Sequence, residues 1–121
     1  MTDKPAILVV DSNRGNLELI SQELGRGGYT ILSTASLEEL DQAIEGKERF
    51  ALSLIDLSGF DEGIWERCEE LREAKIPFTL ISPQRSPSIQ RESMKYGASG
   101  LLIKPLNIKD LLEHIRTLLG D

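Results

Sequence analysis

The chain has 121 residues with 14 basic and 20 acidic side chains, and its formal net charge of −6 and lack of a dense Lys/Arg cluster argue against direct binding to nucleic acids. Its single cysteine, Cys68, excludes an internal disulfide and a cysteine-based metal cluster. The length predicts one domain spanning residues 1–121, and the polar start at Met1–Pro5 and the lack of an apolar run of about 18 residues predict a soluble, cytoplasmic protein without membrane association.

Short apolar runs and helical patterns alternate five times along the chain, which predicts an α/β fold with a parallel sheet. The runs are nearly continuous and do not alternate with polar residues, which is typical of strands that helices cover on both faces. Right-handed crossovers between such strands give an open, doubly wound sheet. The predicted strands are Ile7–Val10, Thr30–Leu32, Ala51–Ile55, Phe78–Ile81 and Leu101–Ile103.

The segments between these runs repeat apolar residues at spacings of three and four, as one face of a helix requires. Ser36 and Glu39 form the pattern of a capping box at the start of the second helix, and Asn107 is the predicted N-cap of the last one. The fourth segment, residues 86–95, has the weakest pattern because its apolar residues Ile89 and Met94 are five positions apart. We expect a short, mobile helix there.

Polar side chains follow four of the predicted strands. They are Asp11 after the first strand, Asp56 after the third, Ser82 after the fourth and Lys104 after the fifth. In a doubly wound sheet the carboxyl ends of the strands meet at one crevice, so two carboxylates, a hydroxyl and an ammonium group are expected to lie together. Carboxylate oxygens suit Mg²⁺, and this cation and a lysine would balance the charge of an incoming phosphoryl group. Asp56 is then the candidate nucleophile.

Each of these residues also has an alternative interpretation that involves no chemistry. Asp11 alone is equally well explained as the N-cap of the following helix, Ser82 as a turn residue and Lys104 as a solvated charge. Their joint occurrence at the strand ends, in the right order, favours a shared site. The single histidine, His114, is expected to be a structural or surface residue, and Trp65 is expected to pack against its neighbours.

Four stretches resemble the response-regulator receiver domain of two-component signalling. They read ILVVD at 7–11, LSLID at 52–56, IPFTLIS at 76–82 and YGASGLLIKP at 96–105. The resemblance spans nearly the whole chain and implies a flavodoxin-like receiver fold, a five-stranded (βα)₅ sheet. It also implies a phosphoacceptor domain, not an enzyme with a separate substrate. Such a domain accepts a phosphoryl group on Asp56 from a histidine kinase or phosphotransfer protein and signals to a downstream output protein or domain.

The same resemblance implies roles for the residues at the strand ends. Asp11, Asp56 and the backbone carbonyl of Ser58 would hold Mg²⁺. Ser82 would be the hydroxyl that switches position upon phosphorylation, and Lys104 would contact the phosphoryl group. The peptide bond between Lys104 and the following proline would be cis.

The sequence departs from the family pattern at four places. Ser12 stands where the family has a second acid that ligates the metal, so we expect a weakened Mg²⁺ site. The loop after Asp56 lacks the usual Met-Pro pair and reads one residue short. Pro83 replaces a small residue after the switch hydroxyl and stiffens its loop, and Leu101 replaces the aromatic residue that rotates upon activation in the family.

Two other functions compete with phosphoryl acceptance, which is the leading hypothesis. The departures favour a pseudo-receiver, a binding module that signals through protein contacts without phosphorylation. An FMN protein of the flavodoxin type shares the sheet topology but needs a phosphate-binding loop rich in Ser, Thr and Gly after the first strand. Here Asp11 begins that loop, and its carboxylate would repel the phosphate, so no organic cofactor is expected.

Overall fold

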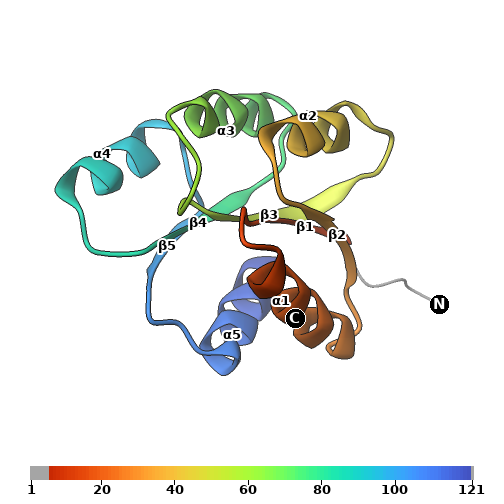
Figure 1. The fold of residues 1–121 in the computed structure, drawn as a ribbon. Helices are drawn as coiled ribbons and strands as arrows, with labels where there is room; N and C mark the ends of the chain where they lie inside the picture. Colours follow the sequence, from red (N-terminus) through yellow and green to blue (C-terminus); the bar gives the residue numbers. More distant parts are fainter. Residues whose placement is uncertain (1–5, 121) are drawn as a thin grey trace.

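The computed structural model describes residues 6–120, so the polar segment Met1–Pro5 and the last residue, Asp121, lie outside the described residues. Residues 6–120 form a five-stranded parallel sheet in the order β2-β1-β3-β4-β5, with a helix after each strand (Figure 1). The strands are β1 (Ala6–Val10), β2 (Thr30–Thr34), β3 (Phe50–Asp56), β4 (Phe78–Ser82) and β5 (Gly100–Ile103). The helices are α1 (Arg14–Arg26), α2 (Leu37–Glu45), α3 (Gly63–Glu73), α4 (Pro87–Lys95) and α5 (Ile108–Leu119).

Helices cover both faces of the sheet, which confirms the predicted doubly wound α/β fold. Figure 1 shows α1 and α5 on one face and α2, α3 and α4 on the other. Ile7 and Val9 of β1 belong to the apolar cluster that includes α1 and α5, whereas Leu8 and Val10 belong to the cluster that includes α2 and α3. Because β1 contributes to both clusters, its apolar run has no polar alternation.

The structure excludes one alternative interpretation at the start of α1 and modifies the predicted capping box of α2. Asn13, not Asp11, is the N-cap of α1, and Asp11 instead accepts a hydrogen bond from the backbone N–H of Asn13 (2.9 Å). At α2, the Ser36 hydroxyl accepts the N–H of Glu39 (3.1 Å) as predicted. The Glu39 carboxylate, however, accepts the N–H of Ala35 (2.8 Å), one residue before the N-cap, so the capping box is displaced by one position.

The short fourth helix is present as predicted, and its mobility stays a prediction. Ser86 caps α4, and the side chain of Met94 is 77% exposed, which explains why its apolar pattern is weak. Tyr96, the C-cap of α4, stacks on Trp65 of α3 with ring centroids 5.5 Å apart, so Trp65 packs between elements as expected. Asn107 caps α5 as predicted. Within the described part of the chain, no helix has the length and apolar character needed to cross a membrane.

Candidate functional site

The carboxyl ends of β1, β3 and β5 bring three charged side chains together. Asp11 follows β1 directly, Asp56 is the last residue of β3, and Lys104 follows β5. β1 and β3 are hydrogen-bonded neighbours with Val10 paired to Ile55, so the two carboxylates lie at the same edge of the sheet. Asp11 is 2% exposed and Asp56 is 4% exposed. Two adjacent buried carboxylates repel each other unless positive charge or a proton compensates them.

Both carboxylate oxygens of Asp56 have partners. The ammonium group of Lys104 lies 2.6 Å from Asp56 Oδ2, and the backbone N–H of Ser58 donates to Asp56 Oδ1 (2.9 Å). Lys104 Nζ is also 3.5 Å from the hydroxyl of Ser58. The peptide bond between Lys104 and Pro105 is cis. The ion pair therefore holds Asp56 in place with its charge compensated from one side of the pocket.

Asp11 is held on one oxygen only. Its Oδ1 accepts the backbone N–H of Asn13, whereas its Oδ2 is buried and has no hydrogen-bond partner among residues 6–120. Burial raises the pKa of the Asp11 carboxyl, the hydrogen bond from Asn13 opposes that rise, and the neighbouring charge of Asp56 adds to it. Lys104 lowers the pKa of Asp11 by a smaller amount. The pocket thus contains a carboxylate oxygen that lacks a positive partner.

Ser12 connects the loop after β1 with the loop after β3. Its hydroxyl donates a hydrogen bond to the backbone carbonyl of Ser58 (2.9 Å). Gly59, which follows Ser58, has a positive φ of 81°, and a Cβ atom on it would lie 2.1 Å from Ser12 Oγ. The loop after β3 therefore depends on a glycine at position 59, both for its backbone conformation and for the space that the Ser12 side chain occupies.

The oxygens in this pocket fit a hard divalent cation. Asp11 Oδ2 lacks a partner among residues 6–120, the Asp56 carboxylate lines the same pocket, and the Ser58 carbonyl belongs to the residue whose N–H binds Asp56. Oxygens of this kind are the ligands that Mg²⁺ prefers, and Mg²⁺ usually keeps several of its waters. Residues 6–120 contain no group of three or more His, Cys, Asp or Glu side chains that could hold a metal ion. The two carboxylates and one carbonyl thus make an acidic but sparse donor set.

Ser82 ends β4 but engages its own loop. Its hydroxyl donates to the backbone carbonyl of Gln84 (2.6 Å) and accepts a long hydrogen bond from the N–H of the same residue (3.4 Å). Ser82 is fully buried, and Pro83 beside it lines the pocket that contains Asp56 and Lys104. The Ser82 hydroxyl therefore lies at the carboxyl end of β4, at the same edge of the sheet as Asp56, but its hydrogen bonds are made to the loop after β4.

A pocket of about 650 Å³ extends from the charged residues along the face formed by α1 and α5. Asp11, Asp56 and Lys104 line it, together with apolar side chains that include Leu19 and Ile108. Leu19 is 62% exposed on α1. This apolar extension could not be predicted from the sequence, because the residues of α1 and α5 that line it follow the pattern of ordinary amphipathic helices.

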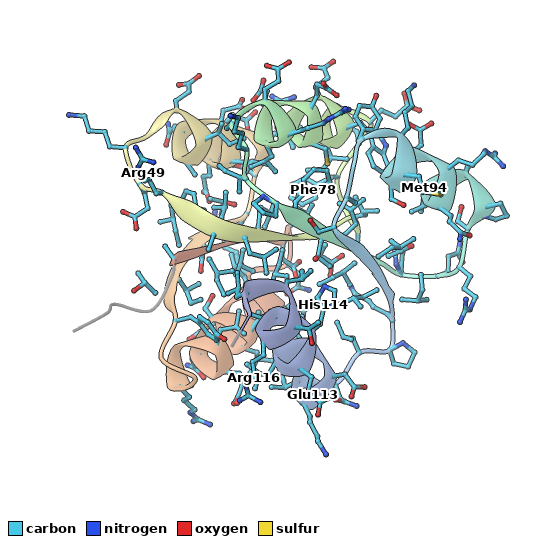
Figure 2. All side chains as sticks on the ribbon, turned by 180° about the vertical axis from the view of Figure 1, so that it is seen from behind. Arg49, Phe78, Met94, Glu113, His114 and Arg116 are labelled. Carbon is cyan, nitrogen blue, oxygen red and sulfur yellow. The ribbon has the colours of Figure 1, made fainter. Side chains whose placement is uncertain are left out.

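The remaining candidates have structural roles. His114 of α5 lies against the sheet (Figure 2), and its Nε2 is 2.9 Å from the hydroxyl of Thr79 in β4. A Cβ atom on Gly100 would come within 2.7 Å of the His114 ring, so this glycine makes room for the histidine. Burial lowers the pKa of His114 and raises the pKa of Cys68, a core residue, to about 12. Neither side chain faces the acidic pocket.

Comparison with known proteins gives a family match and similar solved structures. A family model described as the response regulator receiver domain matches residues 7–116. The receiver domain protein (CheY-like) from Methanospirillum hungatei JF-1 is 29% identical, has a TM-score of 0.89, and the match covers 98% of this chain and 95% of that one. A Burkholderia pseudomallei response regulator was solved with a phosphorylated aspartic acid, a calcium ion and citrate. It is 26% identical with a TM-score of 0.80, over 91% of this chain and 65% of that one.

The curated relatives differ in length: the match covers 97% of the polar-differentiation response regulator DivK of Brucella ovis, at 27% identity, but only about half of two others. The probable transcriptional regulator ycf27 of Porphyridium aerugineum is 28% identical over 117 residues, which is 96% of this chain and 48% of that protein. The chain therefore spans about half the length of the first curated relatives that it matches.

Proposed function

Because this chain belongs to the response regulator receiver domain family, whose model matches residues 7–116, it is a receiver domain of two-component signalling, and we propose that Asp56 is its phosphoacceptor. The observation that supports this assignment is the contact of 2.6 Å between Lys104 Nζ and Asp56 Oδ2 in a buried acidic pocket. The proposed donor is a phosphohistidine on a histidine kinase or phosphotransfer protein. The chain then acts as a phosphoacceptor, not as an enzyme with a separate substrate.

In the transfer step, a carboxylate oxygen of Asp56 attacks the phosphorus atom of the phosphohistidine. A P–O bond forms and the P–N bond breaks, and its electron pair stays with the imidazole ring, which takes up a proton. The Ser58 N–H already orients one oxygen of Asp56, and the Lys104 ammonium group, 2.6 Å from the other oxygen, compensates the charge of the carboxylate and then contacts the phosphoryl oxygens. Transfer therefore depends mainly on positioning and on charge compensation.

Asp11, Asp56 and the Ser58 carbonyl are the proposed ligands of Mg²⁺. When bound, this cation supplies a second positive charge to the phosphoryl oxygens. Because Ser12 contributes no negative charge, we expect weaker Mg²⁺ binding than in a site with a third carboxylate.

Ser82 is the proposed switch residue. For its hydroxyl to donate to a phosphoryl oxygen on Asp56, it must give up its hydrogen bond to the Gln84 carbonyl. Such an exchange changes the conformation of the loop between β4 and α4, so phosphorylation would shift the populations of α4 and its flanking loops. Leu101 of β5 cannot reproduce the swing of an aromatic ring, so the coupling from this loop to an output partner must use other contacts.

The pocket between α1 and α5 supports a protein as the donor, because its apolar extension lies beside Asp56. The exposed Leu19 adds apolar surface at its rim. We propose a cytoplasmic protein in which residues 1–121 form a single receiver-like domain that signals to an output protein or domain. The match covers 48% of two curated relatives and 97% of another, so relatives of both lengths are consistent with an output domain or a separate output protein.

The test is phosphorylation by a radiolabelled small-molecule phosphodonor and by phosphorylated histidine kinases, in the presence of Mg²⁺. We expect the wild-type chain to acquire one alkali-labile phosphoryl group, as an acyl phosphate requires, and Asp56→Asn to acquire none. Asp61→Asn is the matched control, because Asp61 lies in the loop after β3 and is exposed. Labelling of Asp56→Asn equal to that of the wild type would refute the assignment of the phosphoacceptor.

The same experiment decides the alternative function. If neither small donors nor kinases label the wild-type chain, although its spectra show a folded protein, the chain is a pseudo-receiver that signals through protein contacts. Ser12 and Pro83 are the sequence features that this outcome would explain.

A further inference from the structure

Ser58 has a partner for each of its polar groups, and each partner comes from a different part of the chain. Its N–H donates to Asp56 Oδ1 (2.9 Å), its hydroxyl lies 3.5 Å from Lys104 Nζ, and its carbonyl accepts from the Ser12 hydroxyl (2.9 Å). The loop after β3 is therefore held to β3, to Lys104 directly after β5 and to the loop after β1. The hydrogen bond from Ser12 to Ser58, here named the Ser12–Ser58 clasp, joins the two acidic loops directly.

The position of the Ser12 side chain is built into the loop. Gly59 turns with φ of 81°, and the Ser12 hydroxyl occupies the space that a Cβ atom at residue 59 would need. This close approach is independent of the hydrogen bond to Ser58 and fixes the hydroxyl over the loop. Ser12 is thus positioned to donate to the Ser58 carbonyl.

A cation in this pocket would meet two kinds of oxygen. Asp11 Oδ2 is buried without a partner among residues 6–120 and is free to bind it. The Ser58 carbonyl, in contrast, already accepts the hydrogen of Ser12. A backbone carbonyl has two lone pairs, so the hydrogen of Ser12 leaves one of them, but the partial positive charge of that hydrogen repels a cation at the same oxygen. The clasp therefore opposes the binding of a cation at the same carbonyl.

We propose that Ser12 is an intramolecular competitor of the divalent cation: its hydroxyl bridges the two acidic loops at the carbonyl where a bound cation would bridge them. The inference rests on the proposed function only in placing the cation at this site. The expected weak binding of Mg²⁺ then has two causes. One is the missing negative charge at position 12, and the other is the hydrogen bond that the Ser12 hydroxyl makes. The two explanations predict opposite effects when the hydroxyl is removed without a change in charge.

The experiment compares the affinity of wild type and Ser12→Ala for Mg²⁺ alone and for Mn²⁺ alone. Amide chemical shifts of Ser58 and Gly59 report Mg²⁺ binding, and calorimetry reports both cations. Because a single neutral hydrogen bond is at stake, we expect Ser12→Ala to bind about two- to tenfold more tightly. Ser21→Ala is the matched control: its hydroxyl also joins two elements, through Ser33 (2.7 Å), but it lies away from the pocket, and we expect unchanged affinity.

A second variant, Ser12→Asp, removes the clasp and adds a negative ligand, so we expect it to bind more tightly than Ser12→Ala. Equal or weaker binding by Ser12→Ala than by wild type would overturn the proposal, because Ser12 would then be neutral or a ligand. Lack of cation binding by all of these variants would also overturn it.

The outcome is separable from that of the proposed function. A rise in affinity in Ser12→Ala without phosphorylation of any variant supports the clasp and refutes the phosphoacceptor. Phosphorylation of Asp56 without a rise in the cation affinity of Ser12→Ala supports the phosphoacceptor and refutes the competition by the clasp. Amide spectra that coincide outside the two loops verify that Ser12→Ala is folded.

Discussion

Replacing Asp11 by Asn should make the protein more stable at neutral pH, although it alters the acidic pocket. The hydrogen bond from the Asn13 N–H is kept, because the Asn side chain retains an oxygen in place of Oδ1. The change removes a buried carboxylate whose Oδ2 has no partner within residues 6–120, and the new amide donates toward the neighbouring Asp56 carboxylate.

The expected gain follows from the cost of leaving a buried polar atom unpaired, about 1–3 kcal/mol. We expect the lower half of that range, about 1–2 kcal/mol, because Asp11 lines a pocket that admits water. For a domain of this size, 1 kcal/mol corresponds to roughly 4 °C in Tm, so Tm should rise by about 4–8 °C.

The gain in stability from Asp11→Asn should depend on pH. Burial raises the pKa of Asp11 above its value in the unfolded chain, so ionisation of Asp11 costs more in the folded state. The destabilisation is absent below the unfolded pKa, grows as the pH rises toward the folded pKa, and is complete above it. The difference in stability between Asp11→Asn and wild type should therefore be largest at neutral pH and shrink in acid.

Urea unfolding in the absence of divalent cations, followed by circular dichroism, measures this difference as a shift in the midpoint at constant m-value. Asp61→Asn is the matched control, because Asp61 accepts the same kind of local hydrogen bond, from the N–H of Gly63 (2.8 Å), but is exposed. We expect no gain from this control. Lower stability of Asp11→Asn than of wild type at neutral pH would show that the Asp11 carboxylate stabilises the fold, and would refute this prediction.

Two further substitutions test the charged and polar contacts. Lys104→Met should lower the free energy of unfolding by about 1–3 kcal/mol, because it leaves the buried Asp56 carboxylate without its ion pair; the lysine is a third exposed, which favours the lower end. Urea titration at neutral pH measures the loss, and full stability in the variant would contradict the importance of the ion pair. Burial lowers the pKa of His114, so wild type should lose stability relative to His114→Gln as the pH falls below about 6.5, whereas a difference independent of pH would show that the ring is freely solvated.

The strands could be predicted from the sequence because each is buried between two layers of helices. Covered on both faces, the run at 52–55 must be small or apolar throughout, and such runs stand out without any knowledge of the fold. The positions of Asp11, Asp56 and Lys104 followed from the topology alone, because the carboxyl ends of parallel strands share one edge. Their roles remain predictions.

The loops could not be predicted in the same way. Asp11 and Asn13 are both good N-caps by residue type, and only the path of the chain after β1 decides between them. The Ser12–Ser58 clasp joins residues 46 positions apart, and nothing in the local sequence specifies it. Gly59 was the available signal, since a glycine next to a polar turn often marks a positive φ or a close approach, but it does not name the side chain that comes close.

Charge balance links the clasp to the proposed chemistry. The resting pocket holds two carboxylates against the single ammonium of Lys104, and replacing the charge of Asp56 by that of a phosphoryl group, about two negative charges, leaves still more negative charge uncompensated. A cation should therefore bind the phosphorylated chain more tightly than the resting chain, in spite of the competition from Ser12. By thermodynamic linkage, the ratio of these two affinities must equal the factor by which saturating cation shifts the phosphorylation equilibrium. If phosphorylation opens the clasp, the Ser12 hydroxyl weakens cation binding only in the resting chain. It then increases the ratio of the two affinities, and with it the effect of the cation on the phosphorylation equilibrium.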